Sequence, residues 1–186
     1  MNQLYLFLCF IPSCIFFLRF LMQYTGCDAF NPACKAVSQI TRPLLILSAP
    51  FAPNKKNICY GAIFWTIILG IIVPFIFWEL NGGVTTNDII PISIINLFFT
   101  LWSIIKLFFY LMVIEAILSW IVSLRYWAMF FNKLVSPILN PFEKLIPPIG
   151  GISLAFLIAF FALSMLDTYV MPMALQVLLE KIVGFF

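Results

Sequence analysis

Four long apolar runs, separated by three more polar stretches, dominate the pattern of hydrophobic and polar positions along the chain. The runs span residues 4–24, 58–78, 92–122 and 152–179. They do not alternate apolar and polar residues as the strands of a membrane β-barrel do. Each run approaches or exceeds about 20 residues, the length that an α-helix needs to cross the hydrocarbon core. The pattern therefore predicts an all-α membrane protein with four transmembrane helices.

The composition supports lipid as the main solvent of this chain. Of its 186 residues, 64% are hydrophobic and 9% are charged, whereas a soluble domain is about 25% charged. So few charged side chains cannot cover a water-facing surface. The length suits one helical bundle.

Basic residues are concentrated in the first and third polar stretches. The stretch between them, residues 79–91, contains two acidic residues and neither Lys nor Arg. Because cytoplasmic loops of membrane proteins are enriched in Lys and Arg, we expect both basic loops in the cytoplasm and both termini outside, in the periplasm. The basic residues are Lys35, Arg42, Lys55 and Lys56 in the first loop, and Arg125, Lys133 and Lys144 in the third.

The two halves of the chain resemble each other. Residues 19–24 align with residues 115–120, and residues 41–45 align with residues 135–139. Each half consists of a span, a basic loop containing prolines and a second span, so we expect two parallel two-helix repeats. The predicted division is a first repeat at 1–80, an outer loop at 81–91 and a second repeat at 92–186.

The third loop contains a predicted helix start at Asn140-Pro141, where asparagine is a good cap and proline suits the first helical position. Apolar residues between Ile138 and Ile146 fall on one face of this helix. We expect Pro147-Pro148 to end the segment and Gly150-Gly151 to form the turn into the last span. Such a helix would lie in the headgroup region with its apolar face toward the lipid.

The first loop contains a similar start at Asn31-Pro32. Ala33, Val37 and Ile40 follow on one predicted face, which we expect to end before Pro43. Two interpretations of these segments stay open. They are either short connectors that lie flat because they are apolar, or a cytoplasmic platform for anionic lipid or a partner. Each basic residue near an anionic leaflet would contribute about 1 kcal/mol to such a platform.

Four charged residues lie inside the predicted spans, where ionisable groups are costly and are candidates for function. Arg19 and Glu115 occupy equivalent repeat positions at one expected depth, and we expect them to pair. Lys106 and Asp167 share the outer half and form a second expected pair. The alternative is that Arg19 and Lys106 extend to opposite interfaces instead.

The chain contains no His and five Cys, with no C-x-x-C pair. It therefore lacks the usual general base and the commonest metal ligand. Cys27 and Cys34 flank a loop, where a metal or redox role is an alternative to two structural thiols. The pattern contains no phosphate loop, metal cluster or nucleophile–base set. We expect a non-enzymatic protein without a cofactor or a nucleic-acid partner, and an intramembrane cysteine or aspartate enzyme is the alternative.

The two basic loops contain a set of prolines, glycines and one asparagine, of which Pro43 and Pro53 in the first loop correspond to Pro137 and Pro147 in the third. The set consists of Asn31, Pro32, Pro43 and Pro53 in the first copy, and Pro137, Pro141, Pro147, Gly150 and Gly151 in the second. In these residues the chain resembles the YggT family, called YlmG in Gram-positive bacteria, cyanobacteria and plastids. The resemblance covers essentially the whole chain as two copies. The first copy departs from the pattern at Leu47, where a proline is expected.

The resemblance implies a small, non-enzymatic inner-membrane protein. The family is associated with osmotic or ion homeostasis, with cell-division gene neighbourhoods, and in plastids with cytochrome cofactor assembly and nucleoid organisation. It implies a scaffold, assembly or osmotic-homeostasis factor that acts through lipid-facing cytoplasmic loops. Anionic lipids, membrane proteins or further copies of the chain are the expected partners. The alternative is an oligomeric ion channel or transporter component whose charged residues line the pathway.

Overall fold

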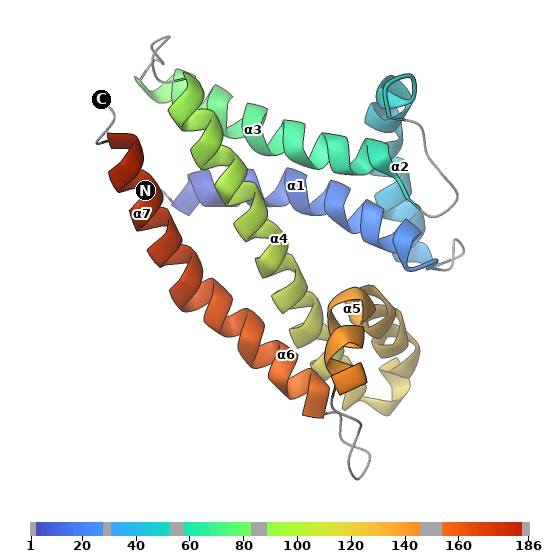
Figure 1. Ribbon diagram of the computed structural model, residues 1–186. Coiled ribbons are helices and arrows are strands. Elements are labelled where there is room, and N and C mark those ends of the chain that lie inside the picture. Colours follow the sequence, from blue (N-terminus) through green and yellow to red (C-terminus); the bar gives the residue numbers. More distant parts are fainter. Residues whose placement is uncertain (1–2, 28–30, 53–57, 83–88, 146–153, 184–186) are drawn as a thin grey trace. The chain divides into compact units, whose positions relative to one another are not determined.

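The computed structural model describes residues 3–27, 31–52, 58–82, 89–145 and 154–183 (Figure 1). Within these ranges the chain is helical and has no β-strand, which confirms the predicted all-α class. The elements in order are α1 (Gln3–Tyr24), α2 (Pro32–Ser48), α3 (Tyr60–Gly82), α4 (Ile89–Ser119), the 3-10 turn η2 (Val122–Leu124), α5 (Arg125–Leu145), α6 (Leu154–Met165), the π-helical turn η3 (Leu166–Val170) and α7 (Met171–Val183).

Among the described residues, three helical segments are long and apolar enough to cross a membrane. They are Tyr60–Leu80, Ile89–Ser119 and Leu154–Lys181, and they correspond to the second, third and fourth predicted spans. The first predicted span is also helical, as α1, and Ile11–Tyr24 forms a shorter apolar stretch within it. The helices therefore agree with a membrane protein.

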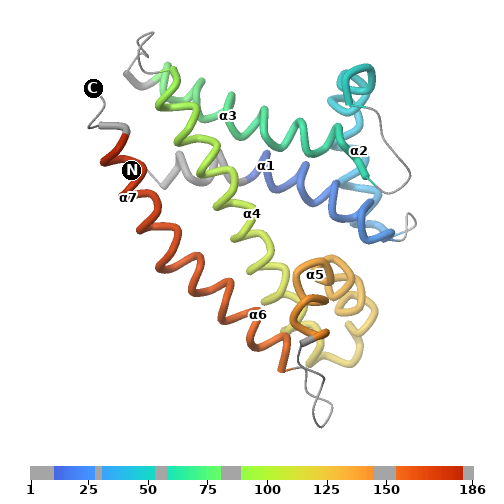
Figure 2. Tube along the Cα trace, in the orientation of Figure 1, coloured from blue at the N-terminus to red at the C-terminus, as the bar shows by residue number. Residues whose placement is uncertain are grey.

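The described chain divides into two compact units. One contains residues 1–104 and 173–186, and the other contains residues 105–172. In the first unit, α1 packs along α3, and α2 contacts both of them, as the traces show (Figure 2). In the second unit, α5 packs against η2 and α6.

The first unit is held together by a seam of small and polar residues. Gly70 on α3 has no side chain at the point where Thr100 on α4 and Ser13 on α1 approach it. A Cβ atom added to Gly70 would lie 2.9 Å from Thr100 Cγ2 and 3.0 Å from Ser13 Oγ, and closer still to Thr100 Oγ1. Small residues let helix backbones approach closely in membranes, where van der Waals contact and hydrogen bonds drive association.

Hydrogen bonds to backbone carbonyls reinforce this seam. Asn96 Nδ2 donates to the carbonyl oxygen of Ile71 at 3.2 Å, and Ser13 Oγ donates to that of Thr66 at 3.5 Å. Asn96, Ser13, Thr66 and Thr100 are buried. A buried polar group without a partner is costly, so these bonds stabilise one arrangement of α1, α3 and α4 over others.

Helix α2 begins as predicted but extends further. Asn31 caps it, since Asn31 Oδ1 accepts a hydrogen bond from the Ala33 N–H at 2.8 Å, and Pro32 is the first helical residue. The expected end before Pro43 is wrong, because the helix continues to Ser48. Pro43 removes one helical hydrogen bond. Next to Pro43, Trp65 Nε1 of α3 donates to the Leu44 carbonyl oxygen at 2.6 Å and links this part of α2 to α3.

Helix α5 begins at Arg125, so the predicted start at Asn140-Pro141 is also wrong. Both Pro137 and Pro141 lie inside one continuous helix. Pro137 has no N–H to donate to the carbonyl four residues earlier, at Lys133. Ser136 Oγ donates to that Lys133 oxygen at 2.8 Å and takes over this role. The predicted residues Pro53, Lys55, Lys56, Pro147, Gly150 and Gly151 lie outside the described residues.

Candidate functional site

An ion pair lies within the apolar part of the second unit. Lys106 Nζ of α4 is 3.4 Å from Asp167 Oδ1, and the two side chains are 37% and 23% exposed. Asp167 belongs to η3, where the Met171 N–H donates to the Leu166 carbonyl in the wider π-helical spacing. Pro172, the next residue, has no N–H to restore α-helical spacing. Single π-turns inside α-helices occur frequently at functional sites.

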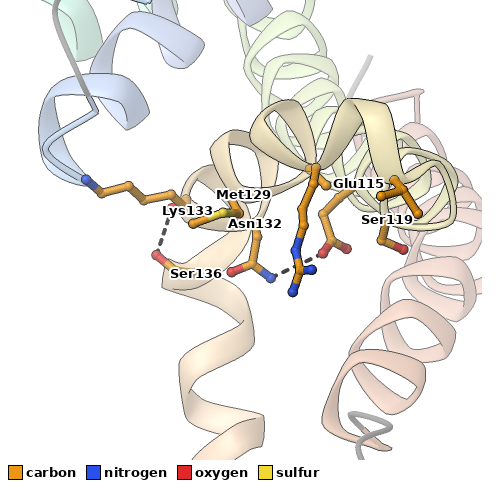
Figure 3. Close-up of a pocket in the computed structure, with 9 residues that line it drawn as sticks. Glu115, Ser119, Met129, Asn132, Lys133 and Ser136 are labelled. Carbon is orange, nitrogen blue, oxygen red and sulfur yellow. Dashed lines mark hydrogen bonds between the residues drawn. The ribbon is translucent and has the colours of Figure 1, made fainter.

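A groove lies in the same unit, between the last turns of α4 and helix α5 (Figure 3). Its volume is about 730 Å³, within the range of small-molecule sites. Its charged and polar lining residues are Glu115, Ser119, Arg125, Asn132, Lys133 and Ser136.

The spacing of these residues explains how the groove forms. Glu115 and Ser119 are four residues apart on α4 and therefore share one face. Arg125, Asn132 and Ser136 are separated by seven and then four residues, which places them in one stripe along α5. The intervening turn η2 separates the two helices, and the groove is lined by the stripe and by the α4 face.

The Glu115 carboxylate is the central acceptor of the groove. Asn132 Nδ2 donates to Glu115 Oε1 at 3.2 Å, and the two side chains point toward each other in Figure 3. Ser119 Oγ donates to the Ala116 carbonyl oxygen at 2.7 Å, which leaves its lone pairs for a further donor. The Lys133 side chain extends away from Glu115 (Figure 3). Exposed Arg125 makes no ion pair with any residue that the structure describes.

The four charged residues predicted inside the spans have different surroundings. The structure brings Lys106 and Asp167 together, and it places Glu115 in the groove with Asn132. The Nε atom of Arg19 is buried and has no hydrogen-bond partner among the described residues. Arg19 and Glu115 belong to different units, so their pairing stays a prediction.

The predicted basic residues that the structure describes are all exposed. They are Lys35, Arg42, Arg125, Lys133 and Lys144. Two of them, Arg125 and Lys133, also line the groove. Asn132 and Ser119 were not among the candidate residues of the sequence analysis. The four-residue spacing of Glu115 and Ser119 at the end of an apolar run is the signal that could have found Ser119.

None of Cys14, Cys27, Cys34 and Cys59 forms a disulfide with a described residue. Cys14, Cys34 and Cys59 are buried, and Cys27 is half-buried. Thr25 Oγ1 and Cys27 Sγ are 3.3 Å apart and share a hydrogen bond. No group of three Cys, Asp or Glu side chains suitable for a metal ion occurs among the residues described.

Comparison with known proteins finds a family model that matches part of the second half of the chain. Residues 94–174 match the sequence model of the CCB3/YggT family. The chain is 28% identical over 158 residues to an uncharacterised protein of Pseudomonas aeruginosa, and this match covers 84% of the chain and 80% of the relative. It is 29% identical over 139 residues to the uncharacterised protein YggT of Escherichia coli K12, with coverages of 74% and 71%. No solved structure matches the chain.

Proposed function

Residues 94–174 belong to the CCB3/YggT family, and on that premise we propose that the chain is a non-enzymatic scaffold or assembly factor of the bacterial inner membrane. It contributes to membrane organisation or osmotic homeostasis. Helices α2 and α5 lie in the headgroup region on the cytoplasmic side, and both termini lie outside. These helices bind lipid, with a preference for anionic lipid. The bound lipid in turn connects the chain to a membrane protein or to another copy of the chain.

The distribution of side chains around α2 is the observation that carries this proposal. Ile40 and Leu47 are 60% and 66% exposed and lie on one face, seven residues apart. Lys35 and Arg42, also seven residues apart and exposed, lie about 140° away around the helix, at 3.6 residues per turn. The buried stripe of Cys34, Thr41 and Ser48 occupies a third side.

This arrangement suits a helix at a membrane surface. In water, exposed Ile40 and Leu47 would leave apolar area hydrated at a cost of about 25 cal/mol per Å². In the headgroup region the same residues face acyl chains, while Lys35 and Arg42 reach phosphates. The buried stripe faces the protein and not the lipid. Its Thr41 hydroxyl has a partner within α2, because Thr41 Oγ1 donates to the Val37 carbonyl oxygen at 2.7 Å.

Trypsin cleavage after Lys35 tests this placement. We expect the chain in nanodiscs, where both membrane faces are accessible, to be cleaved slowly there. Changing Leu47→Asp should accelerate cleavage on the order of tenfold, because a carboxylate is disfavoured among acyl chains. The matched variant Gln39→Asp, on the polar face of the same helix, should change the rate little. Rapid cleavage of the unchanged chain, or equal rates for both variants, would refute the proposed placement of α2.

The ion pair of Lys106 and Asp167 favours a second candidate function. Charged groups inside a span mark ion pathways in many membrane proteins, and both side chains are partly exposed. Several copies of the chain would then form a channel or transporter. Ion flux into liposomes that contain the purified protein distinguishes the two functions. The scaffold proposal predicts no flux above that of empty liposomes, whereas a flux abolished by Asp167→Asn would support the channel.

A further inference from the structure

We propose that the groove between α4 and α5 binds the headgroup of an aminophospholipid, a phosphodiester that carries a primary ammonium group. The inference rests on the proposed function, because it requires α5 to lie at headgroup level. It goes further by assigning a binding site, a ligand class and a role to Glu115, Ser119 and Arg125.

The end of α4 fits the depth of lipid headgroups. The apolar helix ends at Ser119, and Trp120 and Val122 follow it with 87% and 85% of their surfaces exposed. Tryptophan is enriched at the membrane–water interface, where its ring contacts both acyl chains and polar groups. The groove begins at Glu115, one turn before Ser119, so it opens where a headgroup joins its acyl chains.

Two acceptors on α4 suit a primary ammonium group. Glu115 uses one carboxylate oxygen to accept from Asn132, and its second oxygen has no partner within the described chain. Ser119 Oγ donates to Ala116 and can accept in return. An ammonium group has three N–H donors and no acceptor, so it can bind both Glu115 and Ser119. A trimethylammonium group has no N–H and cannot make either bond.

Arg125 supplies the complementary charge for the phosphate. Its guanidinium is planar and can donate two parallel hydrogen bonds to phosphate oxygens. It lies on the groove lining and is exposed. A headgroup with a phosphate and no amine could contact Arg125, but it would leave the Glu115 carboxylate without a cation. The combination of one half-buried acid and one exposed guanidinium therefore selects a zwitterion with a primary amine.

The test is lipid retention by the purified full-length chain. Micelles would contain equal amounts of phosphatidylethanolamine, phosphatidylcholine and phosphatidylglycerol with identical acyl chains, and native mass spectrometry would count the lipids that stay bound. We expect phosphatidylethanolamine to be retained about tenfold better than phosphatidylcholine, the size expected for a hydrogen bond to a charged group. Glu115→Gln should abolish this preference. Arg125→Gln should weaken the retention of phosphatidylethanolamine and of phosphatidylcholine alike, because both phosphates depend on the guanidinium.

Glu143→Gln is the matched control, since Glu143 is an exposed carboxylate on the same α5 stripe but does not line the groove. It should leave the preference unchanged. Equal retention of phosphatidylethanolamine and phosphatidylcholine, or a preference that survives Glu115→Gln, would overturn the inference. Stronger retention of phosphatidylglycerol that Arg125→Gln abolishes would also overturn it, because it would place an anionic headgroup in the groove. If trypsin protection of Lys35 holds in those cases, the headgroup assignment fails while the proposed function stands.

Discussion

Replacing Asp167 with asparagine is expected to lower the free energy of unfolding of the chain by about 2–3 kcal/mol. The change leaves the Lys106 ammonium without its carboxylate in an apolar segment, 3.4 Å from the lost charge. Breaking a buried ion pair typically costs about 3–5 kcal/mol, and the partial exposure of both side chains reduces that figure. Thermal unfolding in detergent measures the effect.

A double variant separates the pair from other effects of the substitution. Lys106→Met together with Asp167→Asn removes both charges, so most of the lost stability should return. Glu180→Gln, an exposed carboxylate near the end of α7, is the control for a charge change in the same helical run. Additive losses in the double variant would show that the contact between Lys106 and Asp167 contributes nothing to stability.

Gly70→Leu is expected to prevent folding of the first unit, and Gly70→Ala should cost about 1–3 kcal/mol, as overpacking of a close-packed interior does. The reason is that even a methyl group at Gly70 would collide with Thr100 and meet Ser13 at 3.0 Å. Thermal unfolding and size-exclusion chromatography of the purified variants measure the two effects.

The collision can be relieved from the other side of the seam. Thr100→Ala alone loses the hydrogen bond from Thr100 Oγ1 to the Asn96 carbonyl, at 2.9 Å, and should cost about 1 kcal/mol. Combined with Gly70→Ala it provides the missing space. The double variant should therefore be more stable than Gly70→Ala alone. A sum of the two single losses would mean that α3 and α4 do not meet at these residues.

Local signals in the sequence predicted the helices and one cap. An apolar run long enough to cross a membrane predicts an α-helix, because lipid offers no hydrogen-bond partners for backbone N–H and C=O groups. Asn31-Pro32 also has a local effect, since Asn31 bonds a backbone N–H only two residues away. These features depend on neighbouring residues alone, so sequence was sufficient to find them.

Long-range contacts explain what the sequence did not reveal. Asn140-Pro141 has the same local signal as Asn31-Pro32, yet it starts no helix, because residues 125–139 before it are already helical. The groove depends on Asn132 reaching Glu115, seventeen residues earlier, across a turn. Glu115 stands out as a charged residue in an apolar run, but nothing in the segment around Asn132 marks that residue as its partner, so only the folded arrangement shows that they meet.

The unequal lengths of α3 and α4 affect where in a cell the protein can reside. Helix α3 has 23 residues and α4 has 31, so they are about 35 Å and 46 Å long at 1.5 Å per residue. A hydrocarbon core of about 30 Å matches the first more closely than the second, and each ångström of mismatch costs a fraction of a kcal/mol. Longer acyl chains lower the mismatch of α4. We therefore expect the protein to concentrate in thicker regions of a membrane, a partition that vesicles with coexisting short-chain and long-chain domains would show by fluorescence.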